Sequence, residues 1–156
     1  LPIFYTVNTA KLSENVWKEA EKMLEQIQKY PQKEEYQKLV EADRINLYER
    51  EAEKGDDRKF LEETDRVFKE NLRGDPAWKL YERKLVYLES KQPDISREFE
   101  RFLKKYPKVM DAYVEYSIYL CRNNKMTQAQ RVYREGRKQT GMTSKRAEEL
   151  RRKLGL

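Results

Sequence analysis

Apolar residues recur every three or four positions along most of this chain, which is the period of an α-helix that buries one face. A stripe in the middle of the chain has intervals of four, three and four residues between its members: Ile95, Phe99, Phe102 and Tyr106. No segment sustains the two-residue alternation of a half-buried β-strand. The pattern therefore predicts an all-α protein.

Turn signals divide this pattern into about eight helices, which we expect to form four antiparallel pairs. The residues predicted to face the core are, helix by helix, Val16, Ala20, Leu24 and Ile27; Tyr36, Leu39, Val40, Leu47 and Tyr48; Phe60, Thr64, Phe68 and Leu72; Trp78, Tyr81, Leu85 and Leu88; Ile95, Phe99, Phe102 and Tyr106; Ala112, Tyr113, Tyr116 and Leu120; Ala129, Val132 and Tyr133; and Ala147, Leu150 and Leu154.

Several helix starts are marked by residues that cap an N-terminus. Asp75 before Pro76 predicts an N-cap followed by the residue preset for the first helical position. Thr127 is predicted to cap a later helix, and Thr143 or Ser144 the last one.

A short phrase of residues recurs in alternate helices. It reads DRVFKENL at 65–72, SREFERFL at 96–103 and AQRVYREG at 129–136. Its aromatic residues are separated by 31 and 34 positions: Phe68, Phe99 and Tyr133. A period of about 34 residues built from helix–turn–helix units indicates a tetratricopeptide-type (TPR) solenoid, in which stacked pairs bury one another's apolar stripes.

The helices between these phrases carry two aromatic residues three positions apart, Trp78 with Tyr81 and Tyr113 with Tyr116. Together with the phrase, these pairs resemble the HAT (half-a-TPR) repeat family. The matching segments are WKLY at 78–81, EKGD at 53–56, REFERFLKKYP at 97–107 and AQRVYREG at 129–136. The resemblance is closest over about residues 45–141 and weaker over 13–44.

The resemblance implies a right-handed α-solenoid of antiparallel helix pairs that binds other proteins. HAT proteins are mostly scaffolds in RNA-processing assemblies, so the resemblance also implies a ribonucleoprotein setting. We expect an N-terminal extension at 1–12, HAT- or TPR-like helical repeats at 13–141 and a C-terminal capping helix at 142–156. Because the chain begins at Leu1, we expect a fragment or a processed form.

Composition argues against an enzyme. The 156 residues include no His, which excludes imidazole acid–base chemistry and removes the commonest metal ligand. The 28 acidic residues are interleaved with cations at helical spacing, as on solvated helix faces. We therefore expect no catalytic residue, cofactor, metal or small-molecule substrate. We expect Cys121, the single cysteine, to be a packed or half-buried thiol without chemistry.

The same composition bears on location. One cysteine fits a reducing compartment, and no apolar run approaches the roughly 18 residues of a membrane span. We expect an intracellular protein of the nucleus or cytoplasm, with an organelle left open, and no membrane partner.

Two surfaces are candidates for partner binding. The first is the face of the helices that carry the paired aromatics, where an extended or helical peptide would meet exposed side chains. The candidate contacts there are Lys79, Glu82, Arg83, Glu115 and Tyr119.

The second candidate is the basic C-terminal end. Residues 1–130 hold 25 basic and 25 acidic residues, so the net charge of +6 falls entirely in the last 26 residues. The candidate contacts there are Arg134, Arg137, Lys138, Arg151, Arg152 and Lys153. Two interpretations stay open: a polar solenoid cap, or a site for an anionic partner, either RNA phosphate or an acidic peptide. Direct RNA binding is the alternative to a protein-binding scaffold. A surface with several Lys and Arg residues and no carboxylate between them would favour an anionic partner.

Overall fold

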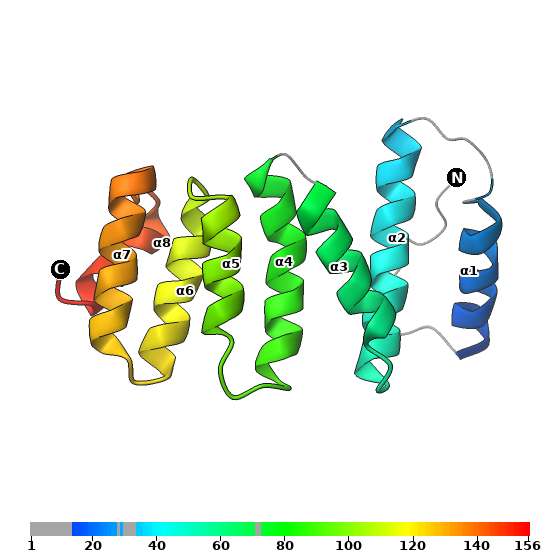
Figure 1. Ribbon diagram of the computed structural model, residues 1–156, viewed down its shortest axis with the longest axis horizontal. Helices are drawn as coiled ribbons and strands as arrows, with labels where there is room; N and C mark the ends of the chain where they lie inside the picture. Colours follow the sequence, from blue (N-terminus) through cyan, green and yellow to red (C-terminus); the bar gives the residue numbers. More distant parts are fainter. Residues whose placement is uncertain (1–13, 28, 30–33, 71–72) are drawn as a thin grey trace. The chain divides into compact units, whose positions relative to one another are not determined.

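The computed structural model describes residues 14–27, 29, 34–70 and 73–156. These residues form eight α-helices and no β-strand, as Figure 1 shows. In chain order the helices are α1 (Glu14–Ile27), α2 (Glu34–Glu53), α3 (Arg58–Glu70), α4 (Gly74–Glu89), α5 (Ser96–Lys105), α6 (Met110–Arg122), α7 (Met126–Thr140) and α8 (Lys145–Lys153). The prediction of an all-α chain with about eight helices is confirmed. The N-terminal extension predicted at 1–12 lies outside the described residues.

The chain divides into two compact units, the first ending at Arg66 and the second beginning at Val67. The boundary falls inside α3, so most of that helix belongs to the first unit together with α1 and α2. The last turn of α3 belongs to the second unit, with α4 to α8.

The first unit has a small apolar core. Trp17 and Leu24 of α1 are buried there with Val40 and Leu47 of α2. The prediction for Val16 is wrong, because its side chain is 41% exposed while the neighbouring indole is buried. Ala20 and Leu24 are buried as predicted, and Trp17, three residues before Ala20, completes their face with a larger ring, which removes more apolar area from water. Two predicted core positions lie outside the described side chains: Tyr36 and Leu72.

Ion pairs attach α3 to the rest of the first unit. Lys59 Nζ lies 2.7 Å from Glu21 Oε1 on α1. Arg66 Nη2 lies 2.8 Å from Glu41 Oε2 on α2. Below these charges the Phe60 ring is fully buried, as its place in the predicted stripe requires.

Aromatic rings fill the core of the second unit. The ring centroid of Phe102 lies 5.0 Å from each of the rings of Trp78, Tyr81 and Tyr106. Phe99 continues the cluster, 4.8 Å from Tyr116. All six side chains are buried. The spacing of the aromatics therefore predicted packing residues correctly.

Tyrosine hydroxyls add directional bonds between the helices of this unit. Tyr81 of α4 donates to Glu98 Oε2 of α5 at 2.7 Å, and Tyr116 of α6 donates to Glu100 Oε1 of α5 at 3.0 Å. Tyr106, just after α5, donates to the backbone carbonyl of Phe68 near the end of α3 at 3.0 Å. Each of these rings is buried while its polar end has a partner, as buried tyrosines require.

Two of the predicted helix starts are wrong by two residues. α4 begins at Gly74 rather than after Asp75, with no side-chain cap on its first amides. A Cβ at Gly74 would lie 2.5 Å from Val109 Cγ2, so the missing side chain lets this turn approach the connection between α5 and α6. α7 begins at Met126 rather than after Thr127. The turn between α6 and α7 ends at Lys125, whose N–H donates to the Leu120 carbonyl at 2.9 Å, so α7 starts directly after it.

Other predicted boundaries are confirmed. Ser144 is the N-cap of α8, and its hydroxyl oxygen accepts a hydrogen bond from the Ala147 N–H at 3.1 Å. Gly141 follows α7 with a left-handed φ of 82°, which a glycine adopts without steric cost.

Candidate interaction surfaces

Two of the predicted contacts on the helices with paired aromatics, Glu82 and Glu115, belong to a charged cluster that joins three helices. Glu82 of α4 lies near Glu115 of α6, and Arg146 of α8 forms an ion pair with Glu115. Burial raises the pKa of the Glu82 carboxyl, and the carboxylates of Glu115 and Asp111 raise it further, while Arg146 opposes them. On α4, the flanking candidate Lys79 is exposed and Arg83 is half-buried.

The exposure expected for Tyr119 is wrong. Its side chain is only 3% exposed, and its ring centroid lies 5.5 Å from that of Phe99. The hydroxyl accepts a hydrogen bond from the Ile95 N–H at 3.0 Å and donates to Asp94 Oδ1 at 3.3 Å. Tyr119 therefore holds the start of α5 against α6 instead of facing a partner.

Some cations of the basic end are engaged within the fold. Arg151 Nη2 lies 2.6 Å from Glu148 Oε1, and Arg152 Nε lies 3.9 Å from the same atom. The hydrogen bond from Arg151 lowers the pKa of the Glu148 carboxyl. Arg146 is paired with Glu115, as described above. Two predicted contacts, Arg151 and Arg152, thus share one carboxylate inside α8.

The remaining cations of the basic end face solvent. Among the described residues, no ion pair joins any of these exposed side chains: Arg131, Arg134, Arg137, Lys138, Lys145 and Lys153. The Arg137 guanidinium lies 5.3 Å from the centroid of the Tyr133 ring. Arg131, Arg134 and Lys138 share one face of α7, since they are spaced three and four residues apart. Glu135 stands among them, four residues after Arg131 and three before Lys138, so this row does not meet the condition of cations without a carboxylate between them.

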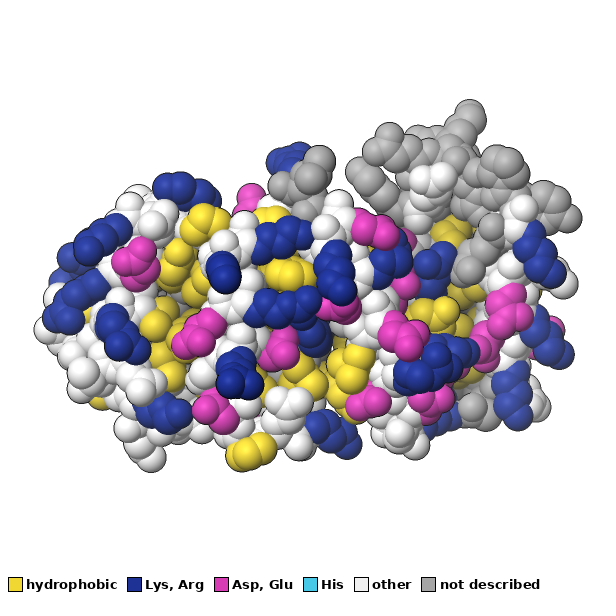
Figure 2. All heavy atoms as spheres, in the orientation of Figure 1, with side chains coloured by type: hydrophobic (Ala, Val, Ile, Leu, Met, Phe, Trp, Pro, Cys, Tyr) yellow, Lys and Arg dark blue, Asp and Glu magenta, His cyan; other side chains and the backbone are white. Residues whose placement is uncertain are grey.

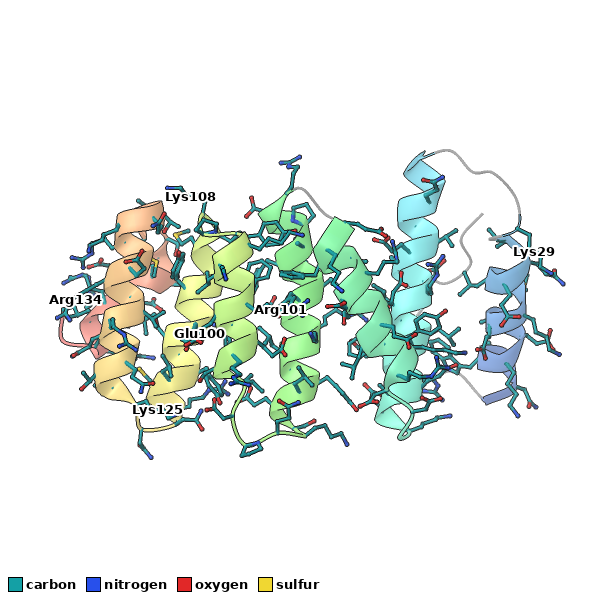
Figure 3. All side chains as sticks on the ribbon, viewed as in Figure 1. Lys29, Glu100, Arg101, Lys108, Lys125 and Arg134 are labelled. Atoms are coloured by element: carbon teal, nitrogen blue, oxygen red, sulfur yellow. The ribbon has the colours of Figure 1, made fainter. Side chains whose placement is uncertain are left out.

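A groove of about 520 Å³ opens between α5 and α7, with α6 as its floor. Its lining residues are Glu100, Leu103, Lys104, Pro107, Tyr113, Tyr116, Arg131, Val132, Glu135 and Gln139. In Figure 2 this strip shows hydrophobic side chains with both basic and acidic side chains around them. Figure 3 places Glu100 on the side of α5 toward α7 and Arg101 on the side toward α4. Sequence analysis missed the groove, because its lining comes from three helices that a one-dimensional pattern does not bring together.

The polar atoms on the floor of the groove are already bonded. Tyr113 donates its hydroxyl hydrogen to the Pro107 carbonyl at 2.9 Å, and Tyr116 donates to Glu100 Oε1 at 3.0 Å. Burial raises the pKa of Tyr113, with a further contribution from Glu135, and burial raises that of Tyr116 to about 12. Both phenols are therefore neutral at physiological pH. Because their hydroxyls are already bonded, the floor offers mainly ring carbon atoms to a ligand.

Sequence analysis also missed a buried polar cluster between α4 and α5. Lys84 is 6% exposed, and its Nζ lies 3.1 Å from Glu98 Oε2, which also accepts the hydrogen bond from Tyr81. Burial pushes the pKa of Glu98 upward, but the Tyr81 hydroxyl and the Lys84 ammonium outweigh it and hold that pKa below its usual value. The cluster links two helices inside the core, and its members stand too far apart in sequence to form a periodic signal.

Cys121 occupies the position expected for it. It is half-buried near the end of α6, and burial raises the pKa of its thiol, partly opposed by Lys153. A raised pKa disfavours the reactive thiolate. Among the described residues, no group of three or more His, Cys, Asp and Glu side chains is placed to hold a metal ion.

Comparisons of this chain with protein-family models, curated proteins and solved structures found no match. Of the helices that the structure describes, none combines the length and apolar character needed to cross a membrane.

Proposed function

We propose that this chain is a non-catalytic helical-repeat scaffold that binds other proteins within a larger assembly. The proposed architecture is a right-handed solenoid of antiparallel helix pairs, each resembling a HAT or TPR repeat. An RNA-processing ribonucleoprotein is the proposed setting, and that part rests on the resemblance to HAT repeats alone.

The observation that carries this proposal is the equivalent placement of the repeated aromatic residues in the second unit. Phe68 of α3 packs 5.1 Å from Tyr81 of α4, and Phe99 of α5 packs 4.8 Å from Tyr116 of α6. Tyr133, the third member, is buried on α7. Each phrase thus supplies one ring to the packing between successive helices, as stacked repeats do.

Stacking of this kind buries one stripe of each helix and leaves the opposite faces for binding. On α4 the proposed contacts are Lys79, Glu82 and Arg83, and on α6 Glu115. At the basic end the exposed candidates are Arg134, Arg137, Lys138 and Lys153. Arg151 and Arg152 stay candidates only if a partner competes with Glu148 for them.

The test is to immobilise the full chain and expose it to cell extract treated with ribonuclease. Retained proteins are identified by mass spectrometry and then re-tested in purified form for direct binding. We expect a discrete set of proteins that binds directly without RNA. If no purified protein binds, the scaffold proposal is wrong.

Direct RNA binding is the second candidate, and the row of exposed cations on α7 favours it. Binding of a labelled single-stranded RNA would be followed by fluorescence anisotropy at increasing salt. Neutralising three or four phosphates gives a slope of about −2 to −3 in a plot of log K against log salt. Replacing Arg131, Arg134 and Lys138 together by Glu would abolish that binding. An RNA affinity that survives this change would exclude the row as the RNA site.

A further inference from the structure

We propose that the groove between α5 and α7 binds an acidic peptide segment of a protein partner, with an apolar side chain of the peptide seated over Tyr113 and Tyr116. This inference rests on the proposed scaffold function and names the surface and the chemistry of the partner. The groove lies between helices that carry the repeated phrase, α5 and α7, whereas the sequence placed one set of candidate contacts on the helices with paired aromatics and the other at the basic C-terminal end.

The floor and walls of the groove suit an apolar side chain. Both floor hydroxyls already have acceptors, so covering them with carbon leaves no polar atom without a bond. Leu103 of α5 and Val132 of α7 extend the apolar lining on either side. The volume of about 520 Å³ lies within the range of about 300–1,000 Å³ typical of binding pockets.

Cations flank this apolar strip on both helices. On α5, Arg97 and Lys104 are exposed seven residues apart, which places them on one face two turns apart. On α7, Arg131 and Lys138 are exposed seven residues apart in the same way, whereas Arg134 lies on the side of that helix away from α5 (Figure 3). Among the described residues these five side chains make no hydrogen bond or ion pair. Lys104 and Arg131 also line the groove itself, one from each wall.

Two carboxylates, Glu100 and Glu135, also line the groove. Glu100 accepts the hydrogen bond from Tyr116, and Glu135 accepts one from the Gln139 side chain at 3.1 Å. Both carboxylates keep their negative charge, so the lining itself is balanced by Lys104 and Arg131. The surplus of positive charge comes from Arg97 and Lys138, which are exposed two turns from Lys104 and Arg131 on the same helices. A peptide with acidic residues on both sides of an apolar residue matches this order of charge and carbon.

The same geometry disfavours single-stranded RNA in the groove. Stacking of bases needs an exposed aromatic face, whereas the side chains of Tyr113 and Tyr116 are each only 4% exposed. The groove thus fits a peptide better than a nucleic acid.

The experiment uses the full chain and three fluorescein-labelled decapeptides. The first has four Glu residues on each side of a central Leu-Phe, the second has Ala-Ala at the centre, and the third has Lys in place of Glu. A labelled decameric oligouridylate serves as the RNA probe. We expect the first peptide to bind. Because the two apolar side chains lose their burial, we expect the second to bind about tenfold or more weakly. We expect no binding of the third peptide.

The matched variants are Lys104→Glu/Arg131→Glu and, as a control with the same change in charge, Lys29→Glu/Lys91→Glu. All four side chains are exposed, and none makes an ion pair with the described residues. Neither double substitution should therefore change the thermal melt. The groove variant should weaken binding of the first peptide about tenfold or more, because two attractive charges become repulsive, and the control should change it less than about twofold.

Three results would overturn the inference: no binding of the first peptide, equal binding of the first and second peptides, or equal effects of the two variants. Binding of the oligouridylate that is lost in the groove variant, without binding of the peptide, would assign the surface to nucleic acid instead. The direct-binding assay with purified partner proteins separates the two proposals. If the groove variant retains every partner, the scaffold function stands and the groove assignment fails.

Discussion

Replacement of Phe99 by alanine should destabilise the protein by about 4 kcal/mol, because the ring joins three helices. Phe99 is buried on α5, 6.4 Å from the ring of Trp78 on α4. On the other side it lies 4.8 Å from Tyr116 and 5.5 Å from Tyr119, both on α6. Removal of this ring would leave a cavity lined by other rings.

The magnitude follows from three contributions. Returning a buried phenylalanine side chain to water costs about 1.5–3 kcal/mol. Each favourable ring pair adds about 0.5–1.5 kcal/mol beyond its buried area. The cavity adds more, because surrounding side chains relax only partly, and core Phe-to-Ala changes in general cost about 3–5 kcal/mol. For a chain of this length each kcal/mol lowers Tm by about 2–4 °C, so we expect a fall of about 8–16 °C.

Thermal melts followed by circular dichroism would measure this change, with urea titrations as a second measure of the free energy of unfolding. Phe99→Leu should cost less than Phe99→Ala, since it keeps most of the buried carbon. Val86→Ala on α4 is the control, because Val86 is 68% exposed and should shift stability by less than about 0.5 kcal/mol. An unchanged melt for Phe99→Ala would refute both the packing argument and the repeat proposal that depends on it.

Three further predictions concern single residues of the second unit. Glu98→Gln should cost about 2–3 kcal/mol at pH 7 in urea titrations, because it leaves the Lys84 ammonium buried without its carboxylate. Since folding lowers the pKa of Glu98, its contribution is complete above the unfolded pKa. That contribution is lost as the pH falls through the folded value, so wild type and variant should converge only at pH values below the lowered pKa of folded Glu98. Gly136→Ala should lower stability by about 1–3 kcal/mol, because a Cβ there would lie 2.8 Å from Tyr113 Cβ; a melt equal to that of wild type would contradict this contact. Cys121 should react more slowly than glutathione with a thiol reagent at pH 7.5, because burial raises its pKa; an equal or faster rate would show that the thiolate is accessible.

The sequence predicted best where the helical period had many large apolar residues to act on. Ile95, Phe99 and Phe102 are all buried, because three bulky side chains at helical spacing leave only one orientation of α5. In α1 the same reasoning chose Val16 over Trp17, since these residues stand four and three positions before the buried Ala20 and both spacings are helical. Tyr119 misled the prediction for another reason: its polar tip suits either a surface or a buried hydrogen bond.

Counting charged residues predicts the net charge of a segment but not which charges form ion pairs. The excess of cations in the last 26 residues is a property of the sequence, but pairing with Glu115 and Glu148 depends on the positions of helices. The position of Lys104 also depends on how the helices are arranged. It lies in the charge-balanced part of the chain, yet it lines the same groove as Arg131. Partners brought together from separate helices leave no periodic trace, so neither the groove nor the Lys84–Glu98 pair was predictable.

The bonded tyrosine hydroxyls have a consequence for how the helices are held lengthwise. Contacts between rings have no strong direction, so an aromatic core alone would tolerate sliding of one helix along its neighbour. A hydroxyl that must meet one acceptor does not tolerate it, and a slip of one turn, about 5.4 Å, would break the bond from Tyr81 to Glu98 and the bond from Tyr116 to Glu100. The rings thus supply cohesion, and the hydroxyls fix the longitudinal alignment of α4 and α6 on α5. A chain with phenylalanine at both positions would keep its apolar volume and lose that alignment.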